Sequence, residues 1–322
     1  MTRMKPRWIN ADKPHLWKAD VAASVDRFNQ WFMDFAPEAF RTTRVETTEH
    51  VKAALVATND LRTLNAATLK LNPGALPTLR MCTAPPLAVD RLVGLAAASK
   101  NLVGRMEKGK LPTKMPVADL DADLTKVCRI LSRLLDRDIF PWLDNRKAPT
   151  DHERDRASTI VADRLCSAVA NPIVRNAQEQ RQLALIGDYL NQRGYRKQGH
   201  PSSKPLREME PGTYTFRMNL AVGKTHKVNI PIDAVIQPKR RRKDRLPILM
   251  EAKSAGDFTN TNKRRKEEAT KIHQLQATYG DTVAFVLFLC GYFGSDYLGY
   301  EAAEGIDWVW EHRIDDLAKL GL

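Results

Sequence analysis

PIDAVIQPKRRRKDRLPILMEAK, residues 231–253, decides how the second half of the chain folds. Its two ends, residues 231–238 and 246–253, are apolar stretches that favour two strands. Between them KRRRKDR carries six positive charges in seven residues and is expected to form the turn of a hairpin. Each strand also carries an acid, Asp233 or Glu251, where a sheet ordinarily buries hydrocarbon. The stretch therefore predicts a polar site built into a sheet.

The segments around this hairpin complete an α/β (α+β) pattern. A helix at 173–194 precedes an alternating strand at 212–222. After the hairpin come a helix at 260–280, with asparagines at its start and a glycine at its end, and an apolar strand at 282–290. The order helix, three strands, helix, strand predicts a mixed sheet flanked by helices.

The first half of the chain has a helical period instead. From Asp20, apolar residues recur at spacings of three and four, the stripe of an amphipathic helix. Proline is expected to end the last of these helices at Asn171 and Pro172. The chain is therefore expected to divide into a mostly helical region, 1–172, and an α/β domain, 173–322. The predicted N-terminal helices span 20–35, 48–61, 90–107, 121–140 and 151–171.

The positive charge is concentrated in one part of the chain. The formal net charge is +13, and residues 196–271 hold 19 Lys and Arg against 8 Asp and Glu. Residues 281–322 hold 8 acids against 2 bases. This segregation favours a polyanionic partner, nucleic acid, over an ordinary solvated surface. Membrane binding is disfavoured because no amphipathic anchor helix accompanies the basic residues.

Several other classes are disfavoured by the composition. The four cysteines form no CxxC pair, which argues against a zinc site or a disulfide framework. The N-terminus lacks the apolar core of a signal peptide, and the longest apolar run, Val283 to Leu289, is too short to span a bilayer. We therefore expect a soluble cytoplasmic protein. GKT at 223–225 lacks the first glycine of a P-loop, where Met218 stands, so ATP binding is not expected.

The hairpin brings Asp233 alongside Glu251, and strand alternation points Glu251 and Lys253 to one face. Two close carboxylates repel each other, and a bound divalent cation removes that repulsion. Two oxygen ligands, waters and a substrate phosphate are what Mg²⁺ prefers. Lys253 could then stabilise charge on the phosphate or orient a water molecule. The arrangement makes sense as a phosphodiesterase site.

Basic and amide side chains near these acids are candidates for contact with nucleic acid. Two alternatives remain open for them: Asn260 or Asn262 as an ordinary helix cap, and the cations as a solvated face. The candidates are Lys239, Arg240, Arg241, Arg242, Lys243, Asp257, Asn260, Asn262, Lys263, Arg264 and Arg265.

Asp233 followed by Glu251-Ala252-Lys253 resembles the PD-(D/E)XK nuclease motif, with Ile232 inserted between the proline and Asp233. The segments GDFTNTNKRRKEEATK, LCGYFGSDYLGYEAAEGIDWVWEHRIDDL and TAPPLAVDRLVGLAAASKNLV are similar to the XamI-like type II restriction endonucleases. This resemblance implies a restriction-endonuclease-like core with Asp233 and Glu251 as Mg²⁺ ligands and Lys253 as the catalytic lysine. It also suggests the Ala252 carbonyl and Glu179 as further ligands.

The same resemblance implies hydrolysis of double-stranded DNA at a short palindromic site, leaving 5′-phosphate and 3′-hydroxyl ends. It further implies a homodimer, a cognate DNA methyltransferase acting on the same site, and DNA binding or dimerisation by residues 1–172. Two alternatives stay open at this point: a metal-dependent repair or recombination nuclease of low sequence specificity, and a DNA-binding protein without catalytic activity.

Overall fold

The computed structural model describes residues 8–145, 147–201, 204–223, 227–240, 246–259, 261–280 and 283–322, and only the backbone of residues 261–265. The chain divides into two compact units. Unit 1 comprises Met1–Phe35 and Arg175–Leu322, and unit 2 comprises Ala36–Val174. Among the described residues no helix is both long and apolar enough to cross a membrane.

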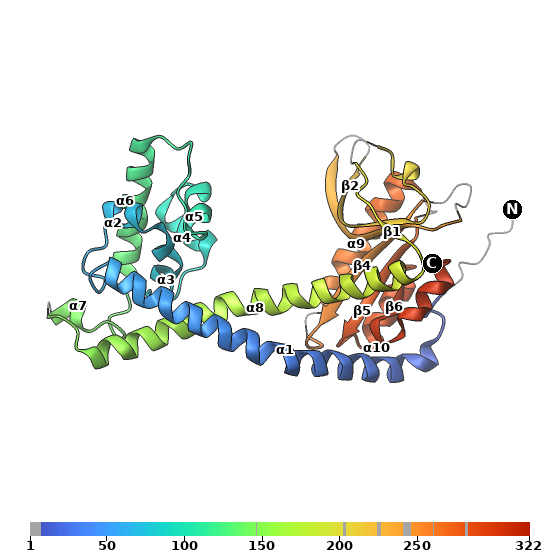
Figure 1. Cartoon of the computed structure of the whole chain (residues 1–322), viewed down its shortest axis with the longest axis horizontal. Coiled ribbons are helices and arrows are strands. Elements are labelled where there is room, and N and C mark those ends of the chain that lie inside the picture. Colours follow the sequence, from blue (N-terminus) through green and yellow to red (C-terminus); the bar gives the residue numbers. More distant parts are fainter. Residues whose placement is uncertain are drawn as a thin grey trace. The chain divides into compact units, whose positions relative to one another are not determined.

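Unit 1 is built on a six-stranded mixed sheet whose strands lie in chain order (Figure 1). The β2–β3 and β3–β4 pairs are antiparallel, whereas the β1–β2, β4–β5 and β5–β6 pairs are parallel. The predicted mixed sheet is thereby confirmed, and β1 and β6 extend it at its edges. The strands are β1 (Arg196–Lys197), β2 (Thr213–Val222), β3 (Val228–Gln237), β4 (Ile248–Ala255), β5 (Phe285–Gly291) and β6 (Asp307–Trp310).

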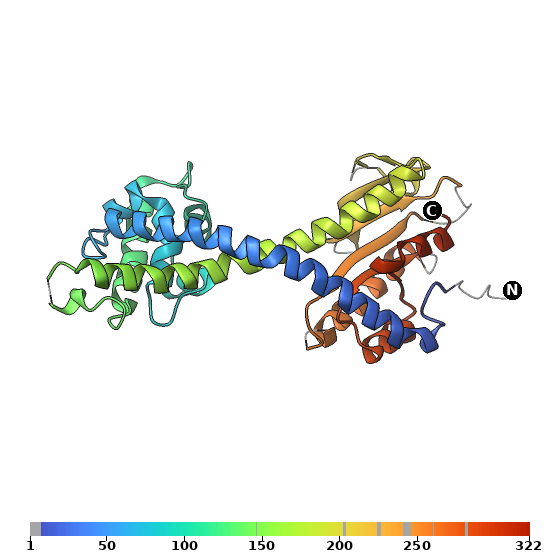
Figure 2. The same cartoon turned by 60° about the horizontal axis from the view of Figure 1, so that its bottom comes forward.

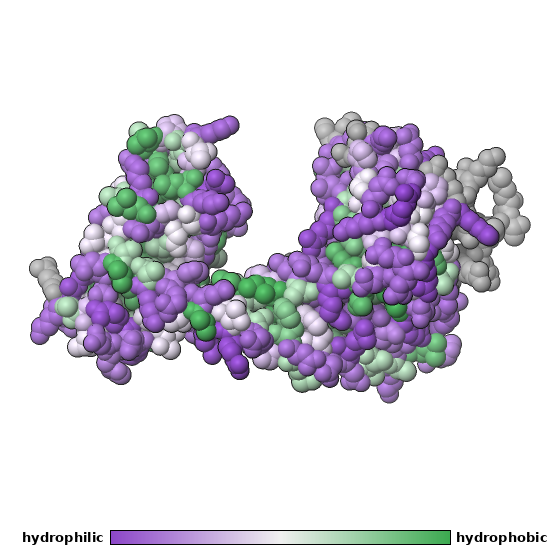
Figure 3. Space-filling model, in the orientation of Figure 1, coloured by the Kyte–Doolittle hydropathy of each residue, from purple (hydrophilic) through white to green (hydrophobic). Residues whose placement is uncertain are grey.

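Helices cover both faces of this sheet (Figures 1 and 2). One face packs against α9 (Thr261–Tyr279) and α10 (Ser295–Ala303), and the other against the end of α8 (Asp151–Gln192) and η3 (Glu311–Leu320). All seven residues of β5 are buried because both faces of this strand are covered. The surface of unit 1 seen in Figure 3 is mostly hydrophilic, in keeping with its many charged residues.

Strands β2 and β3 change faces midway along their length. In β3, Ile232 packs in the core on the α9 side, whereas Ala234 packs in the core on the α8 side. Regular alternation would keep both residues on one face. In β2 the change falls between Phe216, on the α8 side, and Met218, on the α9 side. The side chains of β2 therefore change faces at Arg217, and those of β3 change faces at Asp233. Arg217 has a left-handed backbone with φ of 55°.

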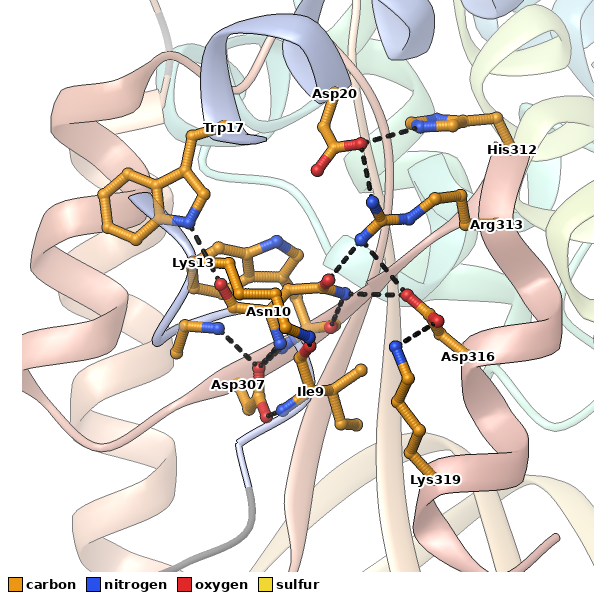
Figure 4. Close-up of polar contacts among 12 residues, drawn as sticks. Ile9, Asn10, Lys13, Trp17, Asp20, Asp307, His312, Arg313, Asp316 and Lys319 are labelled. Carbon is orange, nitrogen blue, oxygen red and sulfur yellow. Dashed lines mark hydrogen bonds and ion pairs between the residues drawn. The ribbon is translucent and has the colours of Figure 1, made fainter. Parts of the chain in front are cut away.

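The beginning of the chain belongs to unit 1 and not to the helical region expected at 1–172. Helix α1 (Pro14–Ala57) starts beside the sheet, where Trp17 packs on the core of the α9 face. Before it, the carboxylate of Asp307 accepts hydrogen bonds from the backbone N–H groups of Ile9, Asn10 and Ala11 (Figure 4). These contacts join the first described residues to β6.

The regular secondary structure of unit 2 is helical in its described residues, apart from one bridge between Thr83 and Leu135. Its core contains Leu55, Leu102, Val127 and Phe140, and Trp142 closes it with an indole N–H donated to Asp60 O. Between α1 and α8 its elements are α2 (Ala66–Leu71), η1 (Pro73–Ala75), α3 (Leu76–Met81), α4 (Val89–Ala96), α5 (Lys100–Met106), α6 (Val117–Leu134) and α7 (Trp142–Asn145).

Several predicted helix boundaries were wrong. Helix α8 continues through Pro172 to Gln192, and α1 likewise continues through Pro37. An interior proline costs about 3 kcal/mol, but each half of α8 is packed on a core, which offsets this cost. The helix predicted over 90–107 is in turn broken at Ala97, whose φ of 45° ends α4.

Candidate active site

Asp233 lies in β3 at the position where the strand changes faces. Its Oδ2 accepts a hydrogen bond of 2.9 Å from the backbone N–H of Ala252 in β4. Burial, and next the negative charge of Glu251, raise the pKa of Asp233 to about 6, although the Ala252 N–H and Lys253 oppose the shift. The carboxyl group is therefore close to a second negative charge, as the predicted pairing of the two strands requires.

Glu251 and Lys253 lie two residues apart on β4 and point to the α9 side of the sheet. Their side chains meet, with Lys253 Nζ 3.4 Å from Glu251 Oε2. Only 3% of Glu251 is exposed, so its charge depends on neighbouring cations. The structure thus brings the predicted residues Asp233, Glu251 and Lys253 together.

Helix α9 adds two residues that the sequence analysis missed. Lys271 Nζ donates to Glu251 Oε1 at 2.7 Å and to Pro231 O at 2.9 Å. Glu268, one turn earlier, lies with its Oε1 3.7 Å from Lys253 Nζ. Their three-residue spacing places both on one helix face, and this spacing was the available signal.

Helix α10 completes a buried polar cluster behind Lys253. The hydroxyl of Tyr297 donates to Glu268, and the carboxyl group of Glu301 lies against the same carboxylate. Among the described residues no protein group donates to either oxygen of Glu301. Burial, and next the charge of Glu268, raise the pKa of Glu301 to about 9. The raised pKa favours the protonated form of Glu301 beside Glu268.

Asp233 and Glu251 suit a divalent cation. A cation between them would remove the repulsion that helps to raise the pKa of Asp233. Among the described residues no three His, Cys, Asp or Glu side chains are grouped as a metal site. The remaining ligands would be the Ala252 carbonyl, waters and substrate oxygens, and hard divalent cations prefer such a set.

Glu179 projects from α8 and pairs with Arg217 of β2 at 2.9 Å. Its charge also contributes to the raised pKa of Asp233, so it lies within electrostatic range of the site. A groove of about 520 Å³ lies beside Pro231 and Lys271, between the start of β3 and α9. Its lining is Asn229, Ile230, Pro231, Lys266, Glu267, Thr270, Lys271 and Gln274.

The candidate DNA-contacting residues are spread more widely. Lys239 lies six residues beyond Asp233, about 20 Å along an extended strand, where its ammonium group donates to Arg193 O. Lys239 therefore lies away from the carboxylates. Asp257 accepts from the backbone N–H of Thr259 just after β4. Arg240 is exposed; Arg241, Arg242, Lys243, Asn260 and the side chains of Asn262, Lys263, Arg264 and Arg265 lie outside the described residues.

Comparison with known proteins identifies the family of the chain. A model of the XamI restriction endonuclease family matches residues 59–310. The chain is also 58% identical, over 97% of its length and 99% of the relative's, to the type II restriction enzyme SalI of Streptomyces albus G. No solved structure matches it. Because one family covers most of both units and the relative covers nearly the whole chain, this protein belongs to the XamI restriction endonuclease family.

Proposed function

We propose that this restriction endonuclease hydrolyses double-stranded DNA at a short palindromic site with Mg²⁺ as its metal ion. Type II restriction enzymes generally need a divalent metal ion. The observation that supports the proposal best is the meeting of Asp233, Glu251 and Lys253 across β3 and β4. Family membership disfavours the two alternatives, a repair nuclease of low specificity and a DNA-binding protein without activity.

In the proposed reaction a water molecule attacks phosphorus and the P–O3′ bond breaks. The leaving O3′ takes up a proton, which gives a 5′-phosphate and a 3′-hydroxyl end. Asp233 and Glu251 would hold the metal ion, with the Ala252 carbonyl and Glu179 as further candidate ligands. The bound ion supplies Lewis-acid activation of the water and neutralises charge on the phosphate.

Lys253 would stabilise the negative charge that develops on the phosphate oxygens. Lys271 holds Glu251 through its 2.7 Å contact. At the start of α9, residues 262–265 would contact the DNA backbone beside the site, and residues 239–243 would contact it further along the duplex.

A plasmid assay tests this proposal. The wild type should cut plasmid DNA into discrete bands when Mg²⁺ is present, and the sequenced ends should share one site. Asp233→Ala and Glu251→Ala should abolish cutting while DNA binding in a gel-shift assay persists. A smear would support a nuclease of low specificity, and intact plasmid at every salt and Mg²⁺ concentration would exclude hydrolysis.

We further propose a homodimer, because a twofold dimer applies one active site to each strand of a palindrome. Light scattering on a size-exclusion column, with and without the cut sequence, measures this directly. A methyltransferase that modifies the same sequence would protect the host, and DNA methylated at that sequence should resist cleavage.

A further inference from the structure

Arg217 has a backbone conformation that arginine rarely adopts. It lies in the middle of the ten-residue strand β2 with φ of 55°, in the left-handed region. A side chain with a Cβ is strained there, whereas glycine is not. Non-glycine residues held in such conformations cluster at functional sites, where the surrounding structure maintains the strain.

The strained residue lies directly across from the proposed metal ligand Asp233. The register pairs Phe216 with Ala234 and Met218 with Ile232, which leaves Arg217 opposite Asp233. The two strands change faces at this same position. The left-handed backbone therefore reorients the chain beside the active site, and a glycine would do so without strain.

The side chain of Arg217 makes little contribution that would explain its presence. It is 55% exposed, and its ion pair with Glu179 is also solvent-exposed. Such surface pairs contribute little to stability. Neither the change of faces in the two strands nor the ion pair with Glu179 thus requires an arginine at this position.

The chemistry of the guanidinium group does provide a reason. It is planar, permanently charged and carries five N–H donors in a fork that fits two phosphate oxygens. A single oxyanion atom, Oε1 of Glu179, already accepts from both Nε and Nη2 of Arg217. We propose that Arg217 is a substrate-binding residue that contacts the DNA phosphate next to the scissile bond, and that Glu179 occupies its place when DNA is absent.

This inference rests on the proposed function, since it needs DNA as the substrate. When DNA binds, the phosphate replaces Glu179 on the guanidinium group. The released carboxylate is then free beside Asp233, where its charge already acts. The exchange would couple DNA binding to completion of the acidic site.

Replacement of Arg217 by glycine separates the backbone strain at this residue from the proposed phosphate contact of its side chain. Arg217→Gly relieves the backbone strain, so its melting temperature should equal or exceed that of the wild type. It also removes one phosphate contact, so single-turnover cleavage should slow at least tenfold. The slope of log K against log salt for binding a duplex without metal should become less steep by about 1. Glu179→Gln should instead tighten binding, because the competing carboxylate is lost.

Arg196 provides the matched control. It is also an exposed arginine of this sheet, paired with Glu210, but it is far from Asp233 in the pairing pattern and has no positive φ. Arg196→Gln should leave the cleavage rate within about twofold and the salt slope unchanged. Arg217→Asn serves if the glycine variant does not fold, because asparagine tolerates this backbone.

The outcomes separate the two proposals. If the wild type cuts DNA and Arg217→Gly or Arg217→Asn cuts at the same rate with an unchanged salt slope, the role of Arg217 is overturned and the proposed function stands. If the wild type itself does not cut, the proposed function fails first.

Discussion

At the scale of single residues, Lys253 lies among several carboxylates. Its ammonium group lies 3.4 Å from Glu251 Oε2 and 3.7 Å from Glu268 Oε1. Burial alone would lower the pKa of Lys253, but the charges of Glu251, Glu268 and Asp233 raise it overall. The amine therefore stays protonated at neutral pH, and it suits charge stabilisation better than the role of a general base.

Glu268 should matter for catalysis because it holds this ammonium group. We expect Glu268→Gln to slow single-turnover cleavage by roughly 10–100-fold, the scale of a misplaced catalytic group. Glu301→Gln is the matched control, since Glu301 is equally buried but already neutral. In a Lys253→Met background, Glu268→Gln should cause no further loss. An equal loss in both backgrounds would show that Glu268 does not act through Lys253.

The proton on Glu301 predicts a pH-dependent stability. Burial and the charge of Glu268 raise the pKa of Glu301 to about 9 in the folded protein, against 4.5 for an exposed glutamate. The contribution of the protonated Glu301 carboxyl to the free energy of unfolding is complete below about pH 4.5. It is lost as the pH rises towards 9, because in that range Glu301 ionises in the unfolded chain but not in the folded protein. Glu301→Gln should therefore raise the melting temperature more at pH 8.5 than at pH 5. A melting-temperature difference between Glu301→Gln and the wild type that does not vary with pH would contradict the prediction.

The sequence predicted the part of the site that lies on neighbouring strands. Asp233, Glu251 and Lys253 follow from a hairpin and a period of two, which are local patterns. Glu268 and Glu301 could not be found in this way, because their meeting depends on how α9 and α10 pack on the sheet. Within α9, Glu268 lies among many charged residues whose solvated and buried members look alike in sequence.

At the level of elements, the pairing of β4 with β5 depends on a glycine. Gly291 pairs with Ala255 at the end of these strands and has φ of 101°. A Cβ at this position would lie 2.1 Å from Ala255 O, a backbone atom that cannot move aside. Since β4 carries Glu251 and Lys253, this contact also fixes the end of the strand that holds these two candidate residues.

We expect Gly291→Ala to lower the stability of unit 1 by on the order of 3 kcal/mol, through backbone strain and overpacking. Gly299→Ala in α10 is the control, since its Cβ would meet only Trp17 at 3.9 Å and alanine favours a helix. Thermal denaturation of both variants measures the difference. A melting temperature of Gly291→Ala equal to that of Gly299→Ala would refute the steric argument.

The elements themselves were largely predictable, but their irregularities were not. Strand β2 reads as one alternating segment, and nothing in its sequence marks Arg217 as the point where it changes faces. Pro172 was a reasonable helix end by local propensity. The burial of Val161 and Leu165 before it, and of Ile186 and Leu190 after it, overrides that preference.

At the scale of the whole chain, residues near its beginning and end are joined inside unit 1 (Figure 4). The amide of Asn10 donates to Trp308 O at 2.8 Å, and the indole of Trp17 donates to Asn10 O at 3.0 Å. Arg313 links Asn10 to Asp20 and Asp316. The sequence analysis assigned the first residues to the helical region because no local pattern signals a contact such as that of Asn10 with Trp308. These two residues are nearly 300 positions apart in the sequence.

Unit 2 has its own core and its own buried ion pair. Arg80 donates to both carboxylate oxygens of Glu107, at 2.8 and 2.6 Å, and it also donates to Leu87 O. These contacts fix the loop that follows α3. Because each unit buries a separate set of apolar side chains, each should unfold as its own cooperative block.

Calorimetry of the full chain should therefore resolve two unfolding transitions, and one substitution in each unit should assign them. Asn10→Ala removes buried hydrogen bonds of unit 1 at a cost of about 2 kcal/mol, which corresponds to roughly 4–8 °C for a unit of this size. Arg80→Met breaks the ion pair of unit 2 and leaves Glu107 without its partner, at a similar cost. Each variant should shift a different transition and leave the other in position. A single transition that both variants shift equally would mean that α1 and α8, which contribute residues to both units, bind the two cores into one cooperative block.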